Sequence, residues 1–112
     1  MIQLTVLLKR HPDLTVEEFH ERWRAHGKVI AGEPTLARHI RRYEQHHRAV
    51  RDYESGDSYD GLALQQYDDM AAFLAFIEEP KYHELIRPDE QTMLDMDSLV
   101  VLFTDGPEVF IP

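Results

Sequence analysis

The chain has 112 residues, a formal net charge of −9 and no cysteine. Autonomous domains commonly contain about 100–150 residues, so this length predicts one domain over residues 1–112 and excludes two. The absence of thiols excludes disulfides, iron–sulfur clusters and cysteine nucleophiles. The acidic balance predicts no nucleic-acid partner, because a protein that neutralises phosphates needs a basic face.

No segment of the sequence is typical of membrane insertion or secretion. The longest uninterrupted apolar stretch, Met70 to Ile77, is far shorter than the roughly 20 residues that span a bilayer. The N-terminal apolar run stops at Lys9 and Arg10, and no basic segment precedes it, so it does not resemble a signal peptide. We therefore expect no membrane partner and a cytoplasmic location, which the lack of cysteine also favours.

The first part of the chain predicts a strand followed by an amphipathic helix. Apolar side chains at every second position from Ile2 to Leu8 indicate a strand over about residues 2–9 with one face on a core. Thr15 and Glu18 form a capping box that starts a helix. We expect Gly27 to loosen or end its first regular stretch. At about 100° per residue, one sector of this helix contains Val16, Phe19, Trp23, His26 and Ile30.

The middle of the chain predicts two strands joined by a loop. From Leu36 to about His47 the sequence leads into a polar strand, one face of which carries Arg41, Tyr43, Gln45 and His47. Turn formers from Asp52 to Ser58 indicate a mobile loop. A further strand is predicted near Tyr59 to Tyr67. Its small residues Gly61 and Ala63 share a face with Tyr67 and leave room above the sheet.

The last third of the chain predicts helical segments and a final strand. Asp68 can cap a helix that packs on the sheet through Met70, Phe73 and Ile77. Pro80 can occupy the first turn of a further helical piece. The run from Ser98 to Thr104 is apolar at its centre and indicates a buried strand.

The predicted order of elements is β-α-β-β-α-β, which is typical of the ferredoxin-like α+β fold. In this fold two helices cover one face of a four-stranded antiparallel sheet. The other face needs a cover, and a second identical subunit can supply it by two-fold symmetry, sheet against sheet. We therefore expect a homodimer.

Several short motifs in this order carry a family resemblance. They are Glu18 to Gly27 (EFHERWRAHG), Arg42 to His47 (RYEQHH), Tyr59-Asp60-Gly61, Pro80-Lys81-Tyr82 and Asp89-Glu90. Together they resemble the EthD family of dimeric α+β barrel proteins, whose patterns are approximately F-x-x-x-W-x-x-H-G and Y-x-Q-N-H. His46 stands where the family usually has asparagine. The resemblance implies a homodimer with a pocket between each sheet and its helices. It does not fix one reaction, because relatives are linked to ether degradation and similar barrels decarboxylate, cyclise or oxygenate polyketide-like aromatics, often without a cofactor.

The candidate site residues come from the helix and the two middle strands. His26 lies in an apolar stripe, where burial favours the neutral imidazole that accepts a proton; it is either a general base or a core histidine with a fixed partner. The polar tips on one face of the second strand could bind a carbonyl or phenol, or pack at a dimer interface. The candidate catalytic residues are His26, His47 and Tyr43. The candidate substrate contacts are Phe19, Trp23, Gln45, Gly61, Ala63, Tyr67 and Phe73.

With the family resemblance, these residues lead us to expect a cofactor-independent enzyme of the lyase, cyclase or oxygenase type. Its substrate would be a small aromatic or polyketide-like carbonyl compound, and the alternative is a carrier that binds an apolar metabolite in the same pocket. We expect no metal, because the adjacent His46 and His47 point to opposite faces of a strand and cannot chelate one ion together. A basic cluster from Arg38 to Arg51 is either a solvated or intersubunit face or an anion site.

Overall fold

The computed structural model describes residues 1–112, and it confirms the predicted α+β order. The main elements are β1 (Ile2–Leu8), α1 (Val16–Gly32), β2 (Arg42–His47), β3 (Gly61–Tyr67), α3 (Met70–Glu78), α4 (Arg87–Met93) and β4 (Val100–Asp105). Shorter segments are α2 (Pro34–Ala37), the 3₁₀ segments η1 (Val50–Ser55) and η3 (Met96–Ser98), and the π-helical turn η2 (Tyr82–Ile86).

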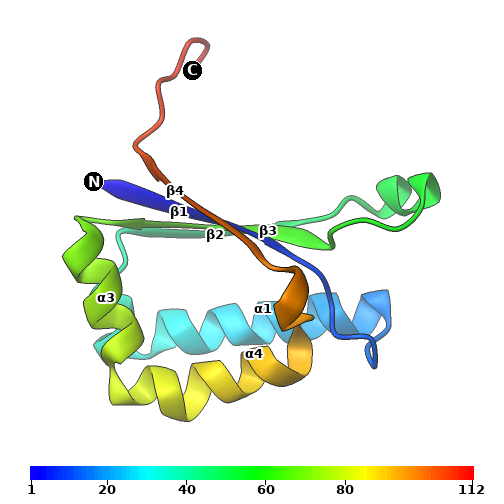
Figure 1. The fold of residues 1–112 in the computed structure, drawn as a ribbon, viewed down its shortest axis with the longest axis horizontal. Coiled ribbons are helices and arrows are strands. Elements are labelled where there is room, and N and C mark those ends of the chain that lie inside the picture. Colours follow the sequence, from blue (N-terminus) through cyan, green and yellow to red (C-terminus); the bar gives the residue numbers. More distant parts are fainter.

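The four strands form one antiparallel sheet in the order β2-β3-β1-β4. Helices α1, α3 and α4 lie together on one side of it, which is the ferredoxin-like arrangement (Figure 1). The C-terminal tail leaves β4 on the opposite side (Figure 1). None of the helices has the length and apolar character needed to cross a bilayer.

The register of the strands fixes which side chains lie under the helices. Tyr43, Gln65, Leu4 and Phe103 stand opposite one another across the four strands and form one row. The next row joins Gln45, Ala63, Val6 and Val101, and a third joins His47, Gly61 and Leu8. Because side chains two residues apart on a strand share a face, all three rows point toward the helices.

Helix α1 begins where the capping box predicts, since Glu18 N–H donates to Thr15 Oγ1 at 3.1 Å and Thr15 N–H donates to Glu18 Oε1 at 2.9 Å. Its buried stripe contains Phe19, Trp23, His26 and Ile30, as expected. The helix continues through Gly27 to Gly32, so the prediction that Gly27 loosens it was wrong. A Cβ at Gly27 would lie 2.6 Å from Gln45 Nε2, so this glycine permits a close approach of β2 instead.

Three local predictions are corrected by side-chain contacts or by position in the sheet. Of the loop predicted from Asp52 to Ser58, residues up to Ser55 belong to η1, and the Arg48 guanidinium donates to the Asp52 and Gly56 carbonyl oxygens at its end. Asp69, not Asp68, caps α3, while Asp68 pairs with Arg41. In the single chain, strand β4 is not buried, because it forms the edge of the sheet; its Leu102 faces away from the helices and is 59% exposed.

Candidate functional site

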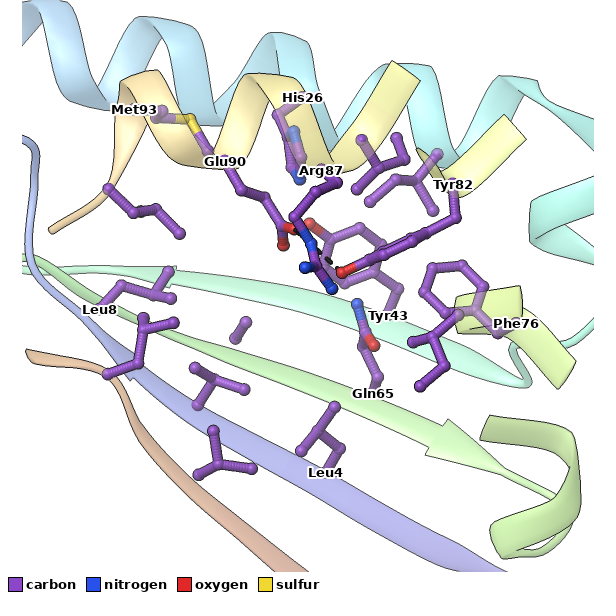
Figure 2. Close-up of a pocket in the computed structure, with 18 of the residues that line it drawn as sticks. Leu4, Leu8, His26, Tyr43, Gln65, Phe76, Tyr82, Arg87, Glu90 and Met93 are labelled. Carbon is purple, nitrogen blue, oxygen red and sulfur yellow. Dashed lines mark hydrogen bonds and ion pairs between the residues drawn. The ribbon is translucent and has the colours of Figure 1, made fainter. Parts of the chain in front are cut away.

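A cavity of about 330 Å³ lies between the sheet and the helices. Eighteen of its 22 lining residues are hydrophobic, so its few polar groups stand out. These groups are the side chains of His26, Gln65, Arg87 and Glu90 and the hydroxyls of Tyr43 and Tyr82. Figure 2 shows the two hydroxyls, the Glu90 carboxyl and the Arg87 guanidinium close together in the middle of the cavity, with the His26 ring directed toward them. An apolar cavity with a few convergent polar groups is the usual form of a small-molecule site.

His26 joins α1 to α4 through a hydrogen bond with a carboxylate. Its Nδ1 lies 2.8 Å from Asp89 Oδ2, and the histidine is only 6% exposed. The other oxygen of Asp89 accepts from the Arg22 guanidinium at 2.7 Å, which fixes the carboxylate. In the neutral ring Nδ1–H donates to Asp89, so Nε2 keeps its lone pair. The pair therefore presents a base to the cavity.

Glu90 follows Asp89 on α4, but its carboxyl lies in a different environment. About 100° of helical rotation separates two neighbouring residues, so Glu90 points into the cavity (Figure 2). Burial raises the pKa of Glu90, and the Tyr82 hydroxyl donates to its Oε1 at 3.0 Å. Burial and the nearby Glu90 raise the pKa of Tyr82 to about 12. Glu90 therefore holds a proton at a higher pH than an ordinary carboxyl does and can supply it.

Tyr43 on β2 provides a hydroxyl on the opposite wall of the cavity. Its oxygen accepts from Gln45 Nε2 at 3.2 Å. Burial raises the pKa of Tyr43, while the hydrogen bond with Gln45 acts in the opposite direction. The phenol thus stays protonated at neutral pH, and its O–H is available as a donor to a bound oxygen.

The structure brings only some of the predicted site residues to this cavity. His26, Tyr43, Trp23, Ala63 and Phe73 line it. Phe19 and Tyr67 have no exposed surface and belong to the packed core outside the lining.

His47, Gln45 and Gly61 do not line this cavity. The Trp23 ring covers His47 and Gly61, and Gln45 packs against the backbone of α1 near Trp23 and Gly27. A Cβ on Gly61 would lie 2.7 Å from Trp23 Cη2, so the room expected above this glycine is already occupied. The Trp23 and His47 rings lie 4.5 Å apart between centroids. Gln45 Nε2 donates to the Trp23 carbonyl oxygen at 2.7 Å.

Sequence reasoning did not assign a role to the polar residues of α4 and of η2, the segment that precedes it. These residues are Tyr82, Arg87, Asp89 and Glu90, together with Gln65 on β3. A signal was present, because Tyr82, Ile86, Glu90 and Met93 recur at helical spacing and mix polar with apolar side chains on one face. No group of three or more His, Asp or Glu side chains is arranged to hold a metal ion.

Comparison with known proteins gives a family and a fold. The model of the EthD domain matches residues 11–97, which is more than half of the chain. No curated protein sequence matches. A dimeric ferredoxin-like protein of unknown function from Bacteroides fragilis is similar in structure, with a TM-score of 0.71, 16% identity, and coverage of 94% of this chain and 95% of that one.

Two similar structures carry names of enzymes. The hydroxynitrile lyase of Passiflora edulis has a TM-score of 0.67 and 14% identity, with 98% of this chain and 96% of that chain covered. A Nitrosomonas europaea protein, provisionally named as an antibiotic biosynthesis monooxygenase, has a TM-score of 0.64 and 17% identity, with 95% and 98% covered. At these identities the likeness establishes the ferredoxin-like fold and not a shared reaction.

Proposed function

Because the chain belongs to the EthD family, we propose that it is a cofactor-independent enzyme of the lyase, cyclase or oxygenase type. Its substrate is a small aromatic or polyketide-like carbonyl compound. The observation that carries this proposal is the His26–Asp89 pair on the wall of an apolar cavity that also holds the Tyr43 hydroxyl. A buried base and a fixed donor are the two groups that proton abstraction next to a carbonyl requires.

The first step is the transfer of a proton from carbon to His26. The Nε2 lone pair takes a proton from the carbon next to the carbonyl, and the C–H electron pair forms the enolate. The negative charge that develops on the carbonyl oxygen accepts a hydrogen bond from the Tyr43 O–H. Asp89 stabilises the imidazolium that results. When the enolate expels a leaving group, Glu90 gives its proton to that group; His26 then releases the abstracted proton to solvent and Glu90 takes one up, which restores both groups. The hydrogen bond between His26 and Asp89 and the position of His26, Tyr43 and Glu90 on one cavity support these roles.

We further infer that the protein acts as a homodimer. The sheet face away from the helices carries Leu7, Leu62 and Leu64 at its centre, and on β4 Val100 and Leu102 are 45% and 59% exposed. An apolar face of this kind marks a protein contact. The Bacteroides fragilis neighbour is itself described as dimeric.

Hydrogen–deuterium exchange of 2-tetralone tests the proposed base, His26, without knowledge of the natural substrate. This compound is a cyclic ketone whose ring is fused to a benzene ring. In D₂O the wild-type protein should accelerate exchange of the protons on the carbons next to the carbonyl. Proton NMR measures the rate of this exchange. His26→Ala should reduce the acceleration by about 10²–10⁴-fold, as expected for loss of a positioned base. His83→Ala, at an exposed histidine, is the matched control and should leave the rate unchanged.

The carrier alternative predicts a different pair of results. A carrier binds 2-tetralone, detected by titration calorimetry, but does not accelerate exchange in any variant. Equal exchange rates for the wild type and His26→Ala would therefore contradict the catalytic proposal, and binding in the same samples would favour the carrier.

A further inference from the structure

A second polar cluster lies outside the cavity, where the start of α1, the end of β2 and η1 meet at the right-hand end of Figure 1. Its side chains form one chain of hydrogen bonds. His47 Nε2 lies 3.0 Å from Gln45 Oε1, and His47 Nδ1 lies 2.6 Å from His20 Nδ1. His20 Nε2 lies 2.9 Å from the Tyr53 hydroxyl, which lies 2.7 Å from Asp60 Oδ1. A separate cavity of about 570 Å³ opens beside the two histidines.

At each end of this chain, the oxygen that faces the chain accepts a hydrogen bond and has no proton to donate. At one end the Asp60 carboxylate, 1% exposed, pairs with the Arg10 guanidinium at 2.7 Å and accepts the Arg10 backbone N–H at 2.9 Å. At the other end Gln45 Nε2 donates to the Trp23 carbonyl oxygen at 2.7 Å. This bond fixes the amide, so the Gln45 oxygen faces His47 and must accept from it.

The fixed ends determine how many protons the two histidines carry. Tyr53 gives its single O–H to Asp60, so His20 must donate to Tyr53 from Nε2. Gln45 accepts through Oε1, so His47 must donate from Nε2. The contact between the two Nδ1 atoms needs one more proton. Two neutral imidazoles carry two N–H protons between them, whereas this chain uses three.

We propose that the His20–His47 pair holds one extra proton, and that this cation positions the Tyr43 hydroxyl of the cavity through Gln45. The second part rests on the proposed function of Tyr43, whereas the proton count does not. Gln45 Nε2 donates to the Tyr43 oxygen at 3.2 Å, which leaves the Tyr43 O–H free for a substrate oxygen. The His47 N–H holds Oε1 of the same amide and keeps it from turning over.

The surroundings of the pair indicate which ring carries the charge. Desolvation and the Arg24 guanidinium lower the pKa of His47 to about 4, so His47 is the neutral ring. Desolvation also lowers the pKa of His20, but the Asp60 carboxylate favours its cation. The extra proton therefore resides on His20 and leaves as the pH rises. The charged groups around the pair are Glu17, Glu21 and Arg24 on α1, Arg48 after β2, and the Arg10–Asp60 ion pair.

Loss of the proton breaks one link of the chain. A neutral His20 has one N–H for two neighbours that both require a donor, so its bond to either Tyr53 or His47 is lost. Loss of the Tyr53 link weakens the attachment of η1 to α1, whereas loss of the His47 link releases the ring whose N–H holds the Gln45 amide. The pair is therefore a positioning device for the site that acts on the acidic side of neutrality.

Imidazole nitrogen NMR of the full chain labelled with ¹⁵N-histidine tests the proton count directly. Between pH 8 and 4.5, His20, assigned with His20→Gln, should become protonated on both nitrogens, while His47 keeps its proton on Nε2 alone. Tyr53→Phe removes one acceptor and should lower the proton affinity of His20 about tenfold, one pH unit. Tyr59→Phe is the matched control and should not change it. Either of two results overturns the proposal: a His20 ring that keeps a single N–H from pH 8 to pH 4.5, or a protonation midpoint of His20 that Tyr53→Phe does not change.

The pH profile of 2-tetralone exchange tests the link to Tyr43 separately. The wild-type profile should contain an inflection at the His20 midpoint, and Tyr53→Phe should move that inflection by the same one pH unit. A profile that does not move, with the NMR result intact, would contradict the positioning role alone. Exchange that is insensitive to His26→Ala would instead contradict the proposed function and leave the proton count standing.

Discussion

Substitution of Gly61 by alanine should destabilise the protein and narrow its cavity, although Gly61 does not line the cavity. The new Cβ would lie 2.7 Å from Trp23 Cη2 and closer still to Cζ3, with the His46 carbonyl oxygen at 3.0 Å. Carbon atoms rest about 3.5–4.0 Å apart, so the indole must move by about 0.8 Å or more. Trp23 is 2% exposed and lines the cavity, so the free direction for this movement is into the site.

The expected cost follows from overpacking a filled core. Such changes typically cost about 1–3 kcal/mol, which for a domain of this size lowers Tm by on the order of 5–15 °C. Thermal unfolding followed by circular dichroism measures the shift, and titration calorimetry with 2-tetralone measures the expected loss of affinity. Gly32→Ala is the matched control: nothing lies within 4 Å of its Cβ, and the substitution should stabilise by about 0.4–1 kcal/mol. A Gly61→Ala protein with the wild-type Tm and affinity would refute this reasoning.

Four further outcomes are expected. Asp89→Asn should keep the fold but lower 2-tetralone exchange by at least about tenfold, because the imidazolium of His26 loses its counter-charge; an unchanged rate would remove Asp89 from the mechanism. The pKa of Glu90 is higher in the folded state than in the unfolded chain, so the folded state binds a proton at this carboxyl more tightly. The free energy of unfolding should therefore fall as pH rises above 4.5. Urea unfolding of Glu90→Gln should lack that fall, and an identical pH dependence would contradict it. Light scattering should give twice 13.2 kDa for the wild type and for Leu74→Lys, and a monomer for Leu102→Lys; a wild-type monomer would sink the dimer proposal. Protein purified without additives should be colourless and free of stoichiometric metal, and one iron or zinc per chain by elemental analysis would overturn the cofactor-free proposal.

Local patterns were sufficient to predict the fold. Three of these patterns depend only on residues close together in the sequence, and the structure confirms them. They are the alternation in β1 and β3, the capping box at Thr15 and the buried stripe of α1. Placement of η1 depends instead on Arg48, which caps carbonyl oxygens up to eight residues away. A turn-rich composition alone could not reveal that contact.

The site was predicted less completely, because strand alternation gives the face of a residue but not its depth. Tyr43 and His47 share a face of β2, yet the Trp23 ring lies between the cavity and His47. Only packing of α1 on the sheet decides this. In the same way, the pairing of His26 with Asp89 joins residues 63 positions apart, and an apolar stripe that contains a histidine predicts only that some partner exists.

The position of β4 at the edge of the sheet has a consequence for solubility. One side of this strand pairs with β1, and its other side leaves backbone N–H and C=O groups free along the apolar run Val100 to Phe103. A free edge of apolar residues without proline is a template on which strands of other chains can pair, which leads to aggregation. Repulsion between chains of net charge −9 opposes that addition at neutral pH. Near the isoelectric point of about 5.1 the repulsion disappears. The protein should then precipitate, and the first contacts between chains should form at the free edge of β4.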